Sequence, residues 1–323
     1  MNICRVCASN NVFKFFQLKY PLLQYPILKS EKHKILEDME DTIHLKYNYC
    51  RSCGIIYSDI SDSLGKKINK IYSDFYNYVS PLESGIGHSE AHSFLDTLKH
   101  IFYDAKSILE IGCYDGFLLY NLKKMAKEVL GIEPSKRGAE IAQKHGIDVI
   151  NDFFPTKKPI IKKFDIVFSR NLIEHLDDPV KFIELQLKLL NRNGFIIFET
   201  PNSDWLVVNG RDMAFHPQHK VLLTNKFVKY MGRLLEIPFV YSKGINHRGI
   251  YVFSLQPLDN CFSLQNCDTD VDLDESLSQF EQKVLGAKTE FRKTLQRHLA
   301  SGHKIGIWGA GSFTGNLYAR VNL

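Results

Sequence analysis

Short apolar runs alternate with helical patterns through the middle of the chain. Six runs read as strands, each bounded by polar or turn residues: SILEIG, EVLGIEP, IDVIND, FDIVFSR, GFIIFETPN and GIYVFSL. Strands separated by helices are typical of a parallel sheet that is covered on both faces. The pattern therefore predicts a doubly wound α/β domain over residues 76–256.

The two flanking regions have different patterns. Residues 1–75 contain two cysteine pairs, many aromatic residues and a middle that reads mostly as turn and loop. Residues 257–323 begin with a polar stretch and continue with helical spacing from about Leu273 to Leu299. A strand, a glycine-rich turn (Gly309 to Gly315) and a helix start follow, which resembles a second phosphate loop. Because no further strands follow in this sequence, we expect an incomplete Rossmann-like unit there, not a second cofactor site.

Composition narrows the class of protein. Hydrophobic residues make up 44% and charged residues 24% of the 323 positions, so the chain can bury a sizeable core. The net charge of +5 falls well short of what marks a nucleic-acid-binding domain. We find no apolar run of about 20 residues, which a membrane span needs, and no apolar signal core at the N-terminus. We therefore expect a cytoplasmic protein with neither nucleic acid nor membrane as partner.

The cysteine pairs predict a metal centre. Cys4 and Cys7 form one C-x-x-C pair, and Cys50 and Cys53 form another. Two such turns supply the four thiolates that zinc accepts in closed structural sites. An odd total of seven cysteines argues against a disulfide framework, and a redox role would need only one pair. The alternative is two unrelated pairs of buried thiols.

The turn after the first strand predicts a cofactor loop. Glu110 ends the strand, and Gly112 and Gly116 let backbone N–H groups approach a ligand at the start of a helix. Tyr114 stands where a dinucleotide loop would have its middle glycine. A carboxylate at this strand end suits the amino group of a methionyl moiety better than a pyrophosphate. The loop thus indicates S-adenosylmethionine (SAM).

Three further strand ends extend this prediction. Glu133 ends the second strand and could bind both ribose hydroxyls. Asp152 could accept from the adenine amino group, while Phe153 covers the adenine face. Asn171 follows the fourth strand. In this order and spacing they favour a class I methyltransferase domain over a non-catalytic Rossmann-like fold.

The chain resembles the three-part sugar C-methyltransferases that act on nucleotide-linked keto-deoxysugars. The resemblance covers nearly the whole chain and rests on the cysteine pairs, the aromatic stretch 74–80, His88, IGCYDGFLL with Asp115 and Gly116, IEPS, Asn171, His175, the segment 247–252 and IGIWGAGSFTGN. It implies a small N-terminal zinc-binding domain, a Rossmann-like class I methyltransferase sheet and a C-terminal Rossmann-like domain. We expect this last part to be an incomplete α/β segment here. The resemblance also implies that Tyr76 and Tyr78 close over SAM; packing of the zinc domain is the alternative.

The family's Tyr-His-Glu-His active-site motif is altered. This chain reads Phe215-His216-Pro217-Gln218-His219, without the glutamate and the tyrosine hydroxyl. His216 or His219 is the candidate general base, because an imidazole titrates near neutral pH. His175 is a candidate for contact with the acceptor. For each histidine, a packing or surface role is the alternative.

Arg248 with Lys243 could bind the diphosphate of a nucleotide substrate, with solvated surface charge as the alternative. The leading function is SAM-dependent C-methylation of a nucleotide-linked 4-keto-6-deoxysugar or a related glycan precursor. The nearest alternative is O-methylation of a sugar or glycan hydroxyl. An alternative of another class is a zinc-dependent nucleic-acid-binding protein with a vestigial methyltransferase fold. The identity of the sugar and the oligomeric state stay open.

Overall fold

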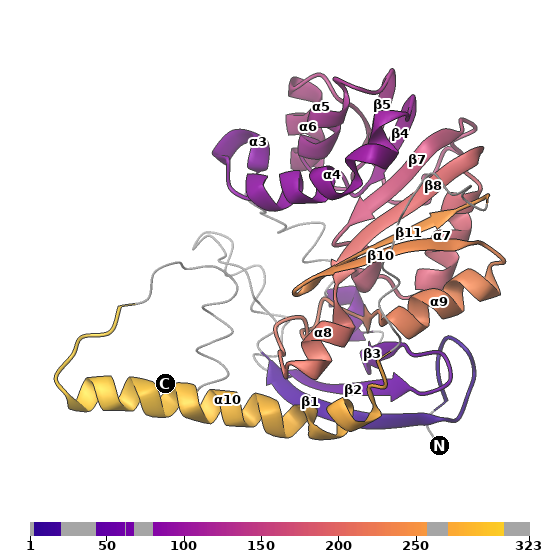
Figure 1. The fold of residues 1–323 in the computed structure, drawn as a ribbon. Coiled ribbons are helices and arrows are strands. Elements are labelled where there is room, and N and C mark those ends of the chain that lie inside the picture. Colours follow the sequence, from indigo (N-terminus) through magenta and orange to yellow (C-terminus); the bar gives the residue numbers. More distant parts are fainter. Residues whose placement is uncertain (1–2, 21–42, 62, 68–79, 257–270, 307–323) are drawn as a thin grey trace.

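The structure, a computed structural model, describes residues 3–20, 43–61, 63–67, 80–256 and 271–306. Within these ranges the strands form two sheets (Figure 1). The larger sheet contains β4 (Ser107–Ile111), β5 (Glu128–Ile132), β6 (Asp148–Ile150), β7 (Phe164–Arg170), β8 (Leu190–Pro201), β10 (Phe239–Ile245) and β11 (Arg248–Ser254). Its spatial order is β10-β11-β8-β7-β4-β5-β6.

Strands β4 to β8 run parallel, and β10 runs in the same direction, so β11 alone is reversed among the described strands of this sheet. β4 pairs in parallel with β5 and β7, β5 with β6, and β7 with β8. β11 is antiparallel to both of its neighbours, β8 and β10, and a tight turn at Asn246 and His247 joins it directly to β10. Asn246 takes the left-handed conformation (φ 52°) that such hairpin turns favour. β10 was not among the predicted strands.

Strand side chains alternate between the two faces of the sheet. On β7, Ile166 and Phe168 belong to one buried cluster, and Val167 between them belongs to the other. Helices α4 (His88–Tyr103), α5 (Phe117–Leu122) and α6 (Lys136–Lys144) contribute to the first cluster. Helices α7 (Pro179–Leu187) and α9 (Asn225–Leu234) contribute to the second.

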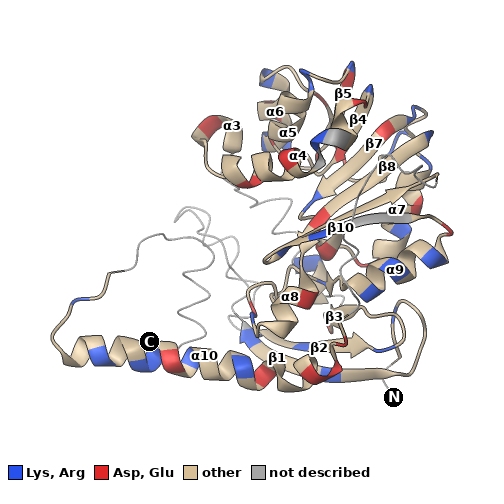
Figure 2. Cartoon of the chain, in the orientation of Figure 1, with Lys and Arg blue, Asp and Glu red and all other residues tan. Residues whose placement is uncertain are grey.

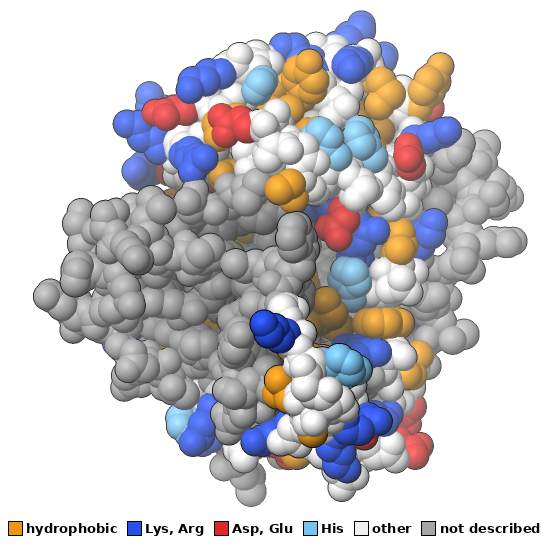
Figure 3. Space-filling model, turned by 90° about the vertical axis from the view of Figure 1, so that its left-hand side faces the viewer, with side chains coloured by type: hydrophobic (Ala, Val, Ile, Leu, Met, Phe, Trp, Pro, Cys, Tyr) orange, Lys and Arg blue, Asp and Glu red, His pale blue; other side chains and the backbone are white. Residues whose placement is uncertain are grey.

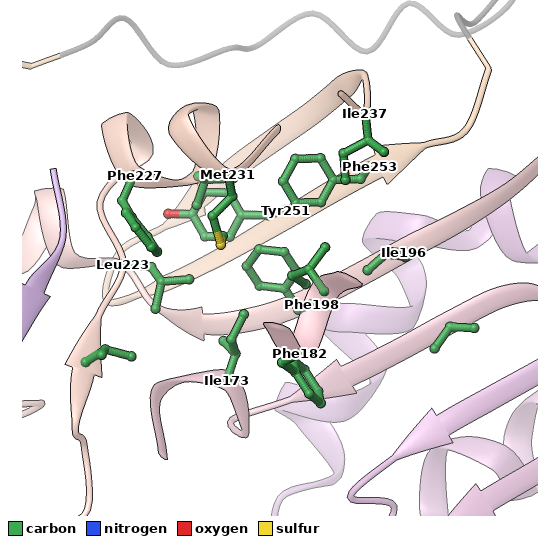
Figure 4. Packing of buried hydrophobic residues seen from close by; sticks show 14 of the residues in the cluster. Ile173, Phe182, Ile196, Phe198, Leu223, Phe227, Met231, Ile237, Tyr251 and Phe253 are labelled. Carbon is green, nitrogen blue, oxygen red and sulfur yellow. The ribbon is translucent and has the colours of Figure 1, made fainter. Parts of the chain in front are cut away.

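The second cluster is the larger apolar core. Phe182 of α7, Phe198 of β8, and Phe227 and Met231 of α9 bring side chains from three elements into this cluster (Figure 4). Each of them has 5% or less of its surface exposed. With helices on both faces of a mainly parallel sheet, the predicted doubly wound, Rossmann-like α/β fold is confirmed.

The smaller sheet joins the N-terminal region to a distant part of the chain. Its strands are β1 (Val12–Tyr20), β2 (Ile43–Cys50), β3 (Ile56–Ser58) and β9 (Val221–Leu222), in that spatial order. β9 pairs antiparallel with β3, with Ile56 opposite Leu222. A strand from within the central domain, between β8 and β10 in sequence, thus completes the sheet of the N-terminal region.

Aromatic packing fixes the C-terminal helix beneath this sheet. α10 (Asp274–Ala300) matches the predicted helix and runs beside β1 (Figure 1). Its Phe280 lies 5.0 Å from Phe16 and 4.9 Å from Phe215 between ring centroids. Leu277 and Val284 of the predicted apolar stripe are buried too, whereas Phe291 is 40% exposed. The remaining elements are α3 (Pro81–Ser84), η1 (Ile173–His175) and α8 (Ser203–Val208).

Two sets of predicted features lie outside the described residues: Tyr76 and Tyr78, and the glycine-rich turn from Gly309 to Gly315. Across the helices that the structure does describe, none combines the length and apolarity needed to cross a bilayer.

Candidate functional site

The predicted cofactor loop connects β4 to α5 through three residues in the left-handed region. Gly112, Tyr114 and Gly116 have φ values of 78°, 46° and 74°. A Cβ atom on Gly116 would lie 3.0 Å from the Cβ of Ala142 on α6. Glycine is therefore required there by both conformation and space. The loop turns its backbone toward the carboxyl ends of β4 and β5.

Glu110 lies at the end of β4 with a buried carboxylate. Only 4% of the residue is exposed, and its Oε2 has no hydrogen-bond partner among the described residues. Burial raises the pKa of Glu110 well above its usual range, and the positive charge of Arg170 opposes that shift. A buried carboxyl group with an unsatisfied oxygen is suited to receive a donor or cation from a ligand.

Glu133 and Asp115 hold the loop in shape. Glu133 Oε2 accepts a hydrogen bond from Tyr114 N–H at 2.8 Å, and its Oε1 accepts one from Ser135 N–H at 2.7 Å. Asp115 accepts from Ser80 Oγ at 2.6 Å and from Phe117 N–H at 3.0 Å. Both carboxylates are buried, and burial raises the pKa of Glu133.

The proposed adenine contacts lie on the open side of the loop. Asp152 accepts from the backbone N–H groups of Phe153 and Lys157, at 2.9 and 2.7 Å. The bond from Lys157 N–H is the main reason that the pKa of Asp152 is lowered. The ring of Phe153 is 61% exposed. An exposed aromatic ring beside an ionised carboxylate is available to a planar, amino-bearing base.

An internal ion-pair network occupies the other strand ends. Glu199 at the end of β8 accepts from Arg170 Nη2 at 2.7 Å, and Arg248 Nη1 lies 3.6 Å from the second oxygen of Glu199. Asn171, in the left-handed region at φ 47°, donates its N–H to the Glu199 carbonyl. The guanidinium predicted for a diphosphate is thus engaged within the protein, while Lys243 is exposed on β10.

The structure brings the three candidate catalytic histidines together. The rings of His216 and His219 are 3.7 Å apart between centroids, and those of His175 and His219 are 4.8 Å apart. His219 Nδ1 lies 2.8 Å from the Ala214 carbonyl, and His175 Nδ1 lies 2.9 Å from the Gln218 carbonyl. Burial lowers the pKa of His175 to about 4 and that of His219 well below its usual value.

Glu174 is a member of this cluster that the sequence analysis did not select. Its Oε2 accepts from Thr200 Oγ1 at 3.0 Å, and its Oε1 lies 3.9 Å from His219 Nε2. The residue is 1% exposed, and burial raises its pKa to about 8. An acidic residue next to His175, just after a buried strand, is the signal that could have identified it.

The four cysteines of the N-terminal region form the second candidate centre. Cys4 Sγ lies 3.7 Å from Cys53 Sγ, and Cys7 Sγ lies 3.5 Å from Cys50 Sγ. None of them forms a disulfide. Two sulfurs bound to one zinc ion at about 2.3 Å with tetrahedral angles lie roughly 3.8 Å apart. The observed spacing fits the predicted tetrahedral four-sulfur set, and all four sulfurs lie within 4.8 Å of one another.

Both cysteine turns have the same backbone geometry. Ala8 N–H donates to the Cys4 carbonyl at 3.0 Å, and Gly54 N–H donates to the Cys50 carbonyl at 2.7 Å. Ala8 and Gly54 both have positive φ, 56° and 87°. A Cβ atom on Gly54 would lie 2.8 Å from the Cβ of Lys226, so α9 closes directly over this turn.

Charge on the described surface is mixed. Positions of lysine and arginine are intermixed with those of aspartate and glutamate along α10 and over the helices of the central sheet (Figure 2). The described part of the face in Figure 3 also interleaves basic, acidic and histidine side chains. On the residues coloured in these two views, basic and acidic side chains are intermixed.

Comparison with known proteins identifies a methyltransferase domain in this chain. The family model described as "Methyltransferase domain" matches residues 68–270. A ubiquinone biosynthesis O-methyltransferase from Pasteurella multocida is 28% identical over 113 residues, which is 30% of this chain and 47% of that protein. The matched stretch therefore spans about half the length of that curated relative.

Solved structures are similar at lower identity. A SAM-dependent methyltransferase of Thermotoga maritima, described as a possible histamine N-methyltransferase, has a TM-score of 0.42 and 19% identity. It covers 51% of this chain and 89% of its own. The N-methyltransferase NodS of Bradyrhizobium japonicum, in complex with S-adenosylhomocysteine, has a TM-score of 0.44 and 15% identity. The match covers 60% of this chain and 98% of NodS. Because the family model alone matches well over half of the 323 residues, the chain belongs to the methyltransferase domain family.

Proposed function

We propose that the protein transfers a methyl group from SAM to a carbon atom of a nucleotide-linked 4-keto-6-deoxysugar. The observation that carries the cofactor assignment is the pair of buried carboxylates, Glu110 and Glu133, at the ends of two adjacent parallel strands beside a left-handed loop. The sugar acceptor rests on the sequence resemblance to the sugar C-methyltransferases, and the family membership supports methyl transfer.

The residues around the loop fit the parts of SAM. Glu110, with an unsatisfied oxygen, suits the methionyl amino group, and Glu133 suits the ribose hydroxyls. Asp152 and Phe153 suit the adenine. When bound, SAM supplies an electrophilic methyl group, so the protein has to align the acceptor and remove one proton.

Proton removal is assigned to the histidine cluster. For a carbon acceptor, the proton lies on the atom next to a ketone, and its loss places negative charge on the ketone oxygen. Burial lowers the pKa of His219 and so favours its uncharged ring, the form that can accept a proton. We assign the proton acceptor to His216 or His219 and acceptor contact to His175. Arg248 and Lys243 stay candidates for the diphosphate.

Methylation at oxygen is the alternative that a specific observation favours. Several curated relatives are named O-methyltransferases, and the chain lacks the tyrosine and glutamate of the carbon-methylating motif. The same histidines could remove a hydroxyl proton.

The decisive experiment is incubation with methyl-labelled SAM and a panel of nucleotide-linked 4-keto-6-deoxysugars. We expect a methylated product whose NMR methyl signal is that of a carbon-bound group. A methoxy signal would establish the oxygen alternative. Absence of labelled product across the panel, with SAM binding intact, would exclude the proposed acceptor.

Replacement of His219 separates catalysis from cofactor binding. We expect His219→Ala to lower turnover by at least about 100-fold, the usual range for loss of proton-transfer catalysis, with SAM affinity changed less than threefold. His145→Ala, at the exposed end of α6, is the matched control. Near-normal turnover of the His219 variant would remove His219 from the mechanism.

We also propose that the four-cysteine centre holds a structural zinc ion. The spacing of Cys4, Cys7, Cys50 and Cys53 carries this proposal. Four protein ligands complete a tetrahedral set, so no position is left for a substrate.

A further inference from the structure

Glu174, His175 and His219 bring three potential metal ligands together outside the cysteine centre. Glu174 and His175 belong to η1, which follows β7, and His219 immediately precedes the segment that leads into β9. One ligand atom from each residue lies within 4.8 Å of the other two. We call these three residues the Glu-His-His cluster.

The hydrogen bonding of His219 directs a lone pair into the cluster. The Ala214 carbonyl can only accept, so His219 Nδ1, 2.8 Å away, carries a proton. In the uncharged ring, Nε2 then carries the lone pair. That nitrogen faces Glu174 Oε1 at 3.9 Å, which is too long for a hydrogen bond. Metal-binding histidines are commonly held in this way, with the other ring nitrogen bonded to a backbone carbonyl.

Glu174 supplies a second, independent observation. Its Oε2 is held by Thr200, while Oε1 has no hydrogen-bond partner among the described residues although the residue is 1% exposed. Leaving a buried polar atom without a partner is costly. A cation between Oε1 and His219 Nε2 would satisfy both atoms.

His175 provides the third ligand. Its Nδ1 contacts the Gln218 carbonyl, and the ring also interacts with the backbone of Asn171. To bind an ion, His175 would have to give up its interaction with the Asn171 backbone and keep the contact with the Gln218 carbonyl. Ligand atoms about 2.1 Å from zinc lie roughly 3.4 Å apart. The 3.9 Å spacing of Glu174 Oε1 and His219 Nε2 therefore has to shorten by about 0.5 Å, and the other spacings, within 4.8 Å, by at most about 1.4 Å.

We propose that Glu174, His175 and His219 bind one divalent transition-metal ion of the zinc class. Two imidazoles and one carboxylate form a ligand set that zinc uses in catalytic sites, with a fourth position open. We assign the open coordination position to the keto oxygen of the acceptor, and this assignment rests on the proposed function. The ion would stabilise the negative charge that develops there, which leaves His216 as the proton acceptor.

Metal content of the full-length protein tests this assignment without any substrate. After equilibration with Zn²⁺ and dialysis, we expect two zinc equivalents per chain by elemental analysis. Glu174→Gln and His219→Ala should each retain one, and Cys50→Ser should lose the other. His216→Ala is the matched neighbour outside the ligand set and should retain two. Circular dichroism establishes that each variant is folded.

Cobalt substitution identifies the two sites separately. Thiolate ligands give intense charge-transfer absorption with Co²⁺, whereas a nitrogen and oxygen site gives only weak bands. We expect the weak bands alone to disappear in Glu174→Gln. A single equivalent in the wild type, or two equivalents that persist in both cluster variants, would overturn the proposal. Metal binding without methyl transfer would refute the proposed function and leave this site standing.

Discussion

Cys50→Ser is expected to remove one zinc equivalent per chain and to destabilise the smaller sheet by more than about 4 kcal/mol. Cys50 ends β2, is fully buried and lies 3.5 Å from Cys7 Sγ. A serine hydroxyl is a poor zinc ligand, and three thiolates would share the buried space without an ion to hold them. Structural zinc contributes folding free energy directly, because the unfolded chain has no preformed site.

Elemental analysis and thermal unfolding, each with and without added chelator, measure this effect. Cys113→Ser is the matched control, since Cys113 is also buried but lies in the cofactor loop, away from the other four cysteines. The control should keep its zinc and respond to chelator as the wild type does. Full zinc content in Cys50→Ser would refute the four-sulfur site.

The second large effect is expected at the cofactor. Glu133→Ala should weaken SAM binding by about 10- to 100-fold, because a hydrogen bond to a charged group contributes about 1.5–3 kcal/mol. Part of the loss would come from the loop, since Glu133 also holds the N–H groups of Tyr114 and Ser135. The fold should survive because Glu133 lies at a strand end and outside the apolar clusters.

Calorimetric titration with SAM and with S-adenosylhomocysteine provides the measurement. Glu140→Ala removes an exposed acidic residue from the neighbouring helix α6 and should leave affinity within twofold. Glu133→Gln keeps the shape but loses the charge, so it separates ribose binding from loop support. Wild-type affinity in Glu133→Ala would exclude this residue from the cofactor site.

Local patterns predicted the parts of this molecule that depend on neighbours in sequence. The cysteine turns need only a two-residue spacing and a left-handed residue such as Gly54, and the loop from Gly112 to Gly116 follows directly from its strand. Parallel strands also place their carboxyl ends together, which is why Glu110 and Glu133 could be expected on one edge of the sheet.

Long-range pairing could not be read from the sequence. β9 has only two residues, too few for any periodic pattern, and its pairing with β3 joins positions far apart in the chain. The partners of Arg248 were hidden for a similar reason. Its ion pair with Glu199 forms only because the β10–β11 hairpin lays β11 beside β8.

The shared β9 strand has a consequence for how this chain can be divided. Lys220 N–H donates to the Glu174 carbonyl at the central sheet, and Ser58 N–H donates to the Lys220 carbonyl from the small sheet. The segment from Ala214 to Lys220, which carries His216 and His219, is therefore hydrogen-bonded to both sheets through Lys220. A fragment that starts at residue 76 would keep the predicted SAM contacts of the loop from Gly112 to Gly116. The segment that carries His219, however, would lose its hydrogen bond to the small sheet. The N-terminal region thus helps to position His219, and replacing it with that of another protein is expected to alter the proposed acceptor site as well.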